Sequence, residues 1–115
     1  MLAREFRLRS AADIARVYKR GVYGGSGGAL SVKAVKSGRA LNRAVIVVGK
    51  KVSKKAVVRN RIRRRLVELV GPLVTTAAPG WDIVLSVHSD ISALPVAELR
   101  NHVAQALGRA GVIQP

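Results

Sequence analysis

Hydrophobic residues recur along the chain at the spacings that are typical of strands and helices. Residues 30–36 and 81–88 alternate between apolar and other side chains, so each stretch predicts a strand. Residues 43–48 are apolar almost throughout, which indicates a strand in the centre of a sheet with both faces covered. Five glycines within residues 21–28 predict a loop or a short edge strand.

Apolar residues three and four positions apart predict three helices, over residues 10–21, 53–71 and 95–111. The capping-box spacing of Ser10 and Asp13 marks the start of the first helix. A Gly-Pro pair at 71–72 should stop the second, because proline lacks the amide hydrogen that continues a helix. The order helix, strands, helix, strand, helix predicts an α+β fold, a two-layer α/β sandwich in which one domain spans residues 1–115.

The second predicted helix is the most informative about function. Its region, residues 49–70, reads GKKVSKKAVVRNRIRRRLVELV. Four apolar residues recur in it at helical spacing and would share one buried face: Val58, Ile62, Leu66 and Leu69. Asn60 and Arg64 would then point away from the core, with Arg61 and Arg63 to the two sides. We therefore expect a folded basic helix rather than a disordered basic arm or a localisation signal.

Positive charge is concentrated in the same region. Residues 1–65 contain 19 basic and two acidic side chains, a net charge of +17, whereas residues 66–115 contain two basic and four acidic ones, a net charge of −2. Nine basic residues fall within residues 50–65 without an acid: Lys50, Lys51, Lys54, Lys55, Arg59, Arg61, Arg63, Arg64 and Arg65. Arginine stays charged at any working pH and its guanidinium fits two phosphate oxygens. The pattern predicts a surface for a polyanion. An anionic membrane is disfavoured, because the helix lacks a Trp/Phe/Leu-rich insertion face.

The sequence offers little chemistry for catalysis by the protein alone. It has no cysteine, its six acidic residues are scattered outside any metal-ligand motif, and no Walker-type phosphate loop is present. His88 and His102 have no neighbouring nucleophile, so we expect ordinary structural roles for both. The lack of cysteine fits the cytoplasm. No apolar run approaches the roughly 20 residues of a membrane helix, and the N-terminus lacks a secretory signal.

Among nucleic-acid binders, the motifs that read DNA grooves are missing, since the chain has neither zinc-finger cysteines nor heptads after the basic helix. The aromatic motif of the four-stranded single-strand RNA-binding domain is missing too. Recognition of the phosphates and shape of a structured RNA is the class that fits best. A ribosomal or other structural RNA-binding protein and a DNA-coating protein are the alternatives.

Residues 50–68, KKVSKKAVVRNRIRRRLVE, resemble the signature of the protein subunit of bacterial ribonuclease P, in which two lysines and a spacer precede Arg-Asn-X-Ile-Lys-Arg. Arg59, Asn60, Ile62 and Arg64 match that pattern, and Arg63 replaces its lysine. Three other segments are similar to the family in the same order: RLRSAADIARVYKRG, RAVIVVGKK and GWDIVLSVH.

The resemblance implies a fold like the second domain of ribosomal protein S5 and a division of labour with a ribonuclease P RNA. That RNA would carry the active site, hold most of the Mg²⁺ and cut precursor tRNA to leave the mature 5′ end. The protein would hold no metal and be inactive alone, and neither membrane nor DNA would be a partner. The expected RNA-binding set is the nine basic residues of 50–65 together with Asn60. The expected residues near the 5′ leader, in a cleft between the first helix and the sheet, are Arg7, Arg9, Ile14, Tyr18 and Arg43.

The chain also departs from the family pattern at a few positions. Ile14 stands where the family often has an aromatic residue, so that only Tyr18 remains for base stacking in the first helix. Val67 stands where a further arginine is common, and Val45 where a glycine is common. The resemblance therefore implies a more aliphatic and less selective leader groove.

Overall fold

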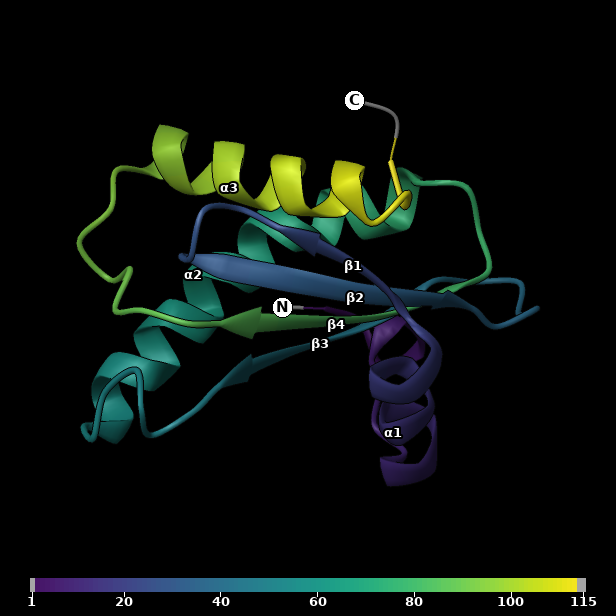
Figure 1. The fold of residues 1–115 in the computed structure, drawn as a ribbon, viewed down its shortest axis with the longest axis horizontal. Coiled ribbons are helices and arrows are strands. Elements are labelled where there is room, and N and C mark those ends of the chain that lie inside the picture. The colour runs from purple at the N-terminus through teal and green to yellow at the C-terminus, as the bar shows by residue number, and fades with distance from the viewer. Residues whose placement is uncertain (1, 114–115) are drawn as a thin grey trace.

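The computed structural model of the protein describes residues 2–113, which form a four-stranded sheet with helices on both of its faces (Figure 1). In chain order the elements are a 3₁₀ helix η1 (Arg4–Phe6), α1 (Ala11–Arg20), β1 (Val22–Gly25), β2 (Leu30–Lys36), β3 (Arg43–Val48), α2 (Ala56–Thr76), β4 (Trp81–Val87) and α3 (Val96–Arg109). The predicted α+β class is confirmed. Within the described residues, every helix is too short or too polar to span a bilayer.

The strands lie in the order β1-β2-β4-β3; β2 pairs antiparallel with both β1 and β4, and β3 pairs parallel with β4. Helix α2 makes the crossover that a parallel pair requires. The predicted strands at 30–36 and 81–88 are confirmed, the second ending one residue early. The glycine-rich stretch supplies the short edge strand β1.

The prediction that residues 43–48 form a central strand is wrong, because β3 lies at the edge of the sheet. Its apolar residues face two different layers: Ala44 packs in the main core beneath α2, whereas Val45 packs on the opposite face against Leu8 and Val17. The N-terminal segment covers part of the free edge, where the Leu8 amide donates to the Ala44 carbonyl at 3.0 Å. A strand at the edge can therefore be apolar almost throughout when most of both faces is covered; Val47 is the one apolar residue of β3 that stays exposed.

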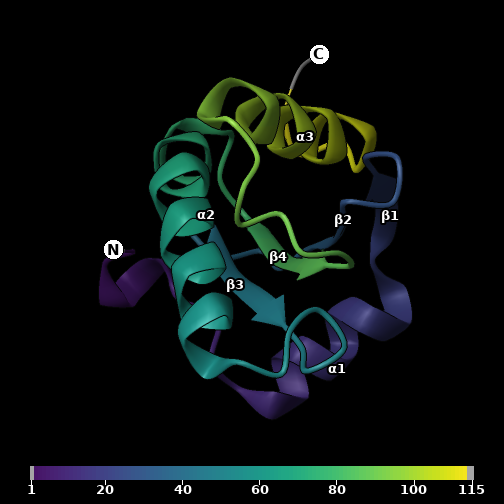
Figure 2. The same cartoon turned by 90° about the vertical axis from the view of Figure 1, so that its left-hand side faces the viewer.

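Helices α2 and α3 cover one face of the sheet and α1 covers part of the other, as the two perpendicular views show (Figures 1 and 2). The main core lies under α2 and α3, with Ile62, Leu66, Val70 and Val74 as the buried stripe of α2. Helix α1 contributes Val17 to a smaller cluster on the other face. Much of that second face is left uncovered beyond α1.

The prediction that Gly71-Pro72 stops the basic helix is also wrong, since α2 runs through Pro72 to Thr76. Pro72 has no amide hydrogen, so α2 loses one backbone hydrogen bond at this position. Because Pro72 is on the exposed side of the helix, the buried stripe continues past it to Val74. The buried side chain of Asn42 then caps the helix end. Its amide donates to the Val74 carbonyl at 2.8 Å, and its oxygen accepts from the Trp81 amide at 2.8 Å.

Helix α1 begins as predicted, because the Ser10 hydroxyl accepts a hydrogen bond from the Asp13 amide at 3.4 Å. It ends at Gly21 for a steric reason, not through a left-handed cap, since φ there is −70°. A Cβ on Gly21 would lie 2.4 Å from the Val17 carbonyl oxygen and 3.1 Å from the Ala34 amide nitrogen. The missing side chain lets the helix end turn closely onto β2.

Candidate nucleic-acid interface

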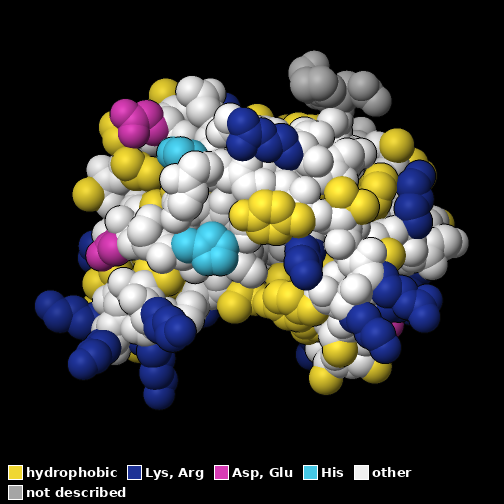
Figure 3. Space-filling view, in the orientation of Figure 1, with side chains coloured by type: hydrophobic (Ala, Val, Ile, Leu, Met, Phe, Trp, Pro, Cys, Tyr) yellow, Lys and Arg dark blue, Asp and Glu magenta, His cyan; other side chains and the backbone are white. Residues whose placement is uncertain are grey.

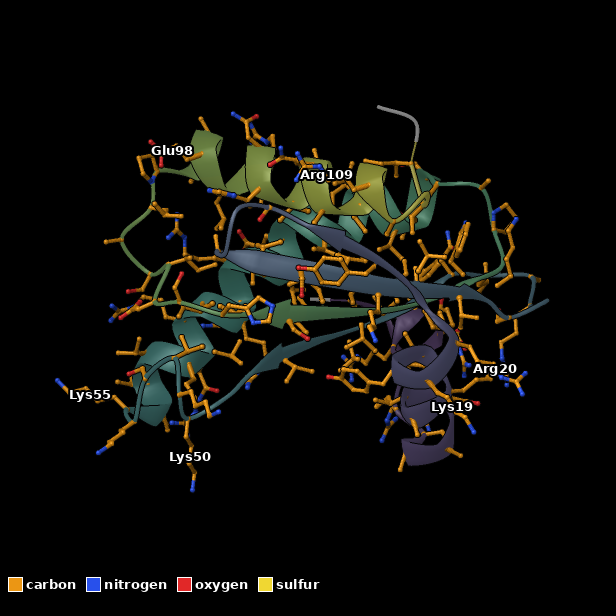
Figure 4. All side chains as sticks on the ribbon, in the orientation of Figure 1. Lys19, Arg20, Lys50, Lys55, Glu98 and Arg109 are labelled. Atoms are coloured by element: carbon orange, nitrogen blue, oxygen red, sulfur yellow. The ribbon has the colours of Figure 1, made fainter. Side chains whose placement is uncertain are left out.

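The first half of α2 and the loop before it present a basic surface, here called the basic face. Its members are Lys50, Lys51, Lys54, Lys55, Asn60, Arg61, Arg63 and Arg64. All of them are exposed except Arg63, which is half-buried. The first turn of α2 contains no acidic residue. In Figure 4, Lys50 and Lys55 point away from the body of the protein into solvent.

Arg63 of the basic face and the nearby Arg59 each make one hydrogen bond within this region. Arg63 donates to the Asn60 side-chain oxygen at 2.7 Å, which holds the two groups together on the surface. Arg59, predicted to bind RNA, is half-buried and donates to the Ser53 carbonyl at 2.8 Å. Arg59 therefore connects α2 to the lysine-bearing loop, and its guanidinium keeps other donors free for a ligand.

Arg65, also predicted to bind RNA, makes hydrogen bonds within the protein. Its guanidinium turns toward the loop between β4 and α3 and donates to three backbone carbonyls, those of Ile91 at 3.4 Å, Ser92 at 2.8 Å and Leu94 at 2.6 Å. Position 65 lies beside the buried stripe of the helix, which brings it close to that loop. Spacing along the helix could not reveal these acceptors, because they come from residues more than 25 positions away.

Arg43, predicted to lie near a leader, is also held inside the protein. Its guanidinium donates to both carboxylate oxygens of Asp82, at 2.9 and 2.8 Å, and to Asp13 at 3.2 Å. Arg16 of α1 donates to the same Asp82 carboxylate at 2.9 Å, while its Nε is buried without a partner in the described residues. Asp82 is completely buried, and its hydrogen bond is the main cause that raises the pKa of Arg43. These ion pairs join α1 to the first residues of β3 and β4.

A groove of about 420 Å³ brings two sets of predicted residues together. It runs between the N-terminal segment, β3 and α2, and is lined by Arg7 and Arg9 on one side and by Arg63 on the other. Arg7 is braced by a hydrogen bond from its Nε to the Leu2 carbonyl at 2.9 Å. The basic face therefore continues, across an apolar floor that includes Ile46, toward the start of α1.

The two predicted residues of α1 have different environments. Ile14 is half-buried and packs against the cluster of Leu8, Val17 and Val84, whereas Tyr18 is 45% exposed. Figure 3 shows the molecule hollowed between a basic lobe and α1, with Lys and Arg on both sides. Figure 4 places Lys50 and Lys55 on one side of this hollow and Lys19 and Arg20 on the other. Ile14 thus helps to pack α1 against the sheet, whereas the Tyr18 side chain remains available for contact with a ligand.

The uncovered face of the sheet carries residues that the sequence reasoning did not select for binding. Tyr23 of β1 is 62% exposed, and Lys33 of β2 donates to the Tyr18 carbonyl at 2.8 Å. His88 Nε2 lies 2.7 Å from Ser31 Oγ. The alternation of β2 would have placed Ser31 and Lys33 on one face, but only the position of α1 shows that this face is open.

The described residues do not bring together the groups that a metal-dependent protein nuclease would use. Within residues 2–113, no three His, Cys, Asp or Glu side chains come together as a metal site. The Ser31–His88 pair has no third group to orient the histidine among the hydrogen bonds of the described residues. The arrangement is suited to binding an extended polyanion across its basic face and groove.

Comparison with known proteins adds to this geometry. A sequence model of the family described as Ribonuclease P matches residues 2–111. The ribonuclease P protein component of Roseiflexus sp. (strain RS-1) is 39% identical over 114 residues, which cover 98% of this chain and 92% of that protein. The corresponding protein of Cyanothece sp. (strain PCC 7425 / ATCC 29141) is 33% identical over 129 residues, with 98% of both chains covered.

Solved structures agree in fold. The RNase P protein from Thermotoga maritima in complex with 1-(4-fluorophenyl)-2-thiourea superposes with a TM-score of 0.78 at 26% identity, covering 90% of this chain and 98% of that one. A Staphylococcus aureus RNase P protein mutant superposes with a TM-score of 0.83 at 24% identity, covering 95% and 91%. Because the identity to the Staphylococcus aureus protein is only 24%, that comparison supports the fold alone.

Proposed function

The chain belongs to the ribonuclease P protein family, and from this premise we propose that its basic face binds the ribonuclease P RNA while the adjoining hollow receives the 5′ leader of precursor tRNA. The protein is the protein component of ribonuclease P, an endoribonuclease ribonucleoprotein of tRNA processing. The proposal concerns which of its surfaces meets which RNA. A ribosomal or other structural RNA-binding role is not favoured.

One observation carries the assignment of the basic face: its positive charge is not neutralised within the protein. The ion pairs among residues 2–113 all involve Arg16 or Arg43, so none involves the basic face. Arg61 and Arg64 are exposed on the side of α2 away from its buried stripe. Guanidinium groups mounted on a packed helix are suited to phosphate oxygens of a folded RNA.

The hollow between α1 and the basic face supports the second part of the proposal. Tyr18 is exposed on α1, and Arg7 and Arg9 are exposed along the groove that runs from the basic face toward the start of α1, so phosphates and a base of a single strand could be bound together. Arg43 would act differently from the other predicted residues. Because its guanidinium is committed to Asp82 and Asp13, it would set the position of α1 and leave contact with the leader to its neighbours.

We assign the chemical step to the partner RNA. The donor set of the described residues is unsuited to a protein-held Mg²⁺ site, because no cluster of three candidate ligands exists among them. Phosphodiester cleavage by protein groups would require such a cluster or a histidine acid–base pair. Mg²⁺ would be bound mainly by the RNA, and the isolated protein would be inactive. We place the complex in the cytoplasm, with which the cysteine-free composition is compatible.

The proposal is tested by reconstitution with a ribonuclease P RNA and precursor tRNA at low magnesium. We expect the RNA-free protein alone to cut nothing and the addition of protein to the RNA to raise cleavage. Replacement of both Arg61 and Arg64 by alanine should remove most of that increase. Replacement of Arg100, an exposed arginine on α3, is the matched control and should leave it unchanged.

Two results would contradict this assignment. Cleavage by rigorously RNA-free protein would transfer the chemistry to the protein. Equal losses from the Arg100 variant and the Arg61/Arg64 variant would mean that total charge, not the basic face, governs assembly. Binding to duplex DNA at the same salt concentration should be weaker than to the RNA, and the reverse order would favour a DNA-coating role.

A further inference from the structure

Tyr23 is an exposed aromatic residue on the uncovered face of the sheet, and its ring lies along its own strand. A Cβ built on Gly25 would be 2.7 Å from Tyr23 Oη and 3.2 Å from its Cε1 and Cζ. The ring therefore occupies the space above Gly25 that any other residue would fill. Residues two apart on a strand share a face, so this side is the one that Tyr23 and Gly25 have in common. With 62% of the residue exposed, the aromatic surface is available to a ligand.

The surface beside the ring is built from small polar residues. Gly25 pairs with Ser31 of β2, and Ser31 pairs with Ser86 of β4, so three small residues cross the sheet in one row. His88 lies next to this row, with its Nε2 at 2.7 Å from Ser31 Oγ. Because the side chains of this row are short, the row does not screen the outer face of the Tyr23 ring on that side.

The same face connects Tyr23 to the proposed leader hollow. Tyr23 pairs with Lys33 in the β1–β2 register, and Lys33 reaches across to the Tyr18 carbonyl of α1. Lys33 thus stands between the two exposed tyrosines. Figure 3 shows hydrophobic, histidine and Lys or Arg side chains close together in the middle of this face and more Lys and Arg at its margins, whereas Asp and Glu are sparse. This combination of exposed aromatic surface and positive charge fits single-stranded nucleic acid.

We propose that Tyr23 is a base-stacking residue that extends the leader path from α1 onto β1 and β2. Resting on the function proposed above, this inference adds a specific contact beyond Tyr18. One unpaired base of the 5′ leader would stack on the Tyr23 ring, with its backbone near Lys33. Gly25 would act as a positioning residue, because its missing side chain keeps the ring flat on the strand. Every base has an aromatic face, so this contact would tolerate different leader sequences.

The test measures precursor tRNA affinity of the reconstituted RNA–protein complex. We compare a leader of about ten nucleotides, within the range of single-strand site sizes, with a leader of one nucleotide. Tyr23→Ala should weaken binding of the long-leader precursor about tenfold and leave the short-leader precursor unchanged. Tyr23→Phe should retain the affinity, because it keeps the ring. Val22→Ala, a change at the neighbouring exposed apolar residue of the same strand, is the matched control and should have no effect.

A second substitution separates stacking from a general effect on folding. Gly25→Ala should displace the ring and weaken long-leader binding in the normal protein, yet have no further effect when combined with Tyr23→Ala. Abasic residues placed along the leader should locate the stacked base: at one position the abasic site should cancel the effect of Tyr23→Ala. Additive losses in the double variant, or an equal loss with both leader lengths, would overturn the proposal.

The inference and the proposed function fail in different ways. If the normal protein gives no preference for the long leader, the function assigned to the hollow is wrong. If that preference is present and survives unchanged in Tyr23→Ala, only the role of Tyr23 is wrong.

Discussion

Two groups of arginines in this protein have opposite environments. At the junction of α1, β3 and β4, Arg16 and Arg43 surround the buried carboxylate of Asp82, and Asp13 completes the group. On the basic face, Arg61 and Arg64 project from α2 without an acidic partner among the described residues. The first group uses guanidinium chemistry to join elements of the fold. The second leaves the same chemistry available to RNA.

The comparison shows that the role of an arginine depends on the acceptors that the fold brings to it. Asp82 is 39 residues from Arg43 and 66 from Arg16 in sequence, yet it pairs with both. Arg65 meets backbone carbonyls in a similar way. A positively charged stretch therefore overestimates the binding surface, and substitutions should divide its members into those that change stability and those that change RNA affinity.

Replacement of Asp82 should have the largest effect. Asp82→Ala would leave Arg43, and the buried part of Arg16, with only the half-buried Asp13 as a counter-charge, so we expect the free energy of unfolding to fall by about 3 kcal/mol. Urea denaturation measures this change. Glu68→Ala removes an exposed carboxylate of α2 that is in none of the ion pairs among the described residues, and it should cost less than about 0.5 kcal/mol. The folded fraction of the Asp82 variant should bind RNA at least as tightly as the normal protein. An equal loss of stability in both variants would contradict the structural role of the buried group.

Replacement of Arg65 should have the next largest effect. Arg65→Ala would remove donors from the carbonyls that it bridges, so we expect a loss of about 2 kcal/mol in unfolding free energy. The dependence of RNA affinity on salt should stay the same. If stability is retained and the salt dependence decreases, Arg65 belongs to the basic face after all.

Arg64→Ala should have the smallest effect on folding and a specific effect on binding. We expect unfolding free energy to change by less than about 0.5 kcal/mol, because the side chain is exposed. The slope of log affinity against log salt concentration should decrease by roughly 0.7–0.9 for the lost phosphate contact. Arg100→Ala provides the control of equal charge. An unchanged slope in the Arg64 variant would remove Arg64 from the interface.

Most of the secondary structure could be predicted because local patterns determine it. The alternation of Leu30–Lys36 predicted β2 with its correct ends, and Ser10 marked the start of α1. Half of the predicted stripe of α2 is confirmed: Ile62 and Leu66 are buried, whereas Val58 and Leu69 are half-buried and the stripe continues through Val70 and Val74. These features depend on neighbours within a few residues, so the sequence contains the necessary information.

The errors arose where distant parts of the chain decide the outcome. The apolar residues of β3 are covered by α2 on one side and by the α1 layer on the other, which a linear pattern cannot distinguish from a central position. Pro72 is tolerated because its face of α2 is exposed and the core continues to Val74. Arg43 donates hydrogen bonds to Asp82 of β4, and Arg65 donates to backbone carbonyls of the loop between β4 and α3. The exposure of Tyr23 likewise depends on where α1 leaves the sheet uncovered.

The hydrogen bond from Arg59 to the Ser53 carbonyl has a thermodynamic consequence for assembly. With the Lys55 amide bonded to the Ser53 hydroxyl at 3.2 Å, it fixes the loop before α2 in the unbound protein. The lysines of that loop and the arginines of the helix then meet the RNA as one preorganised array, and little backbone entropy remains to be lost on docking. Association should lack the large negative heat-capacity change that accompanies coupled folding and binding.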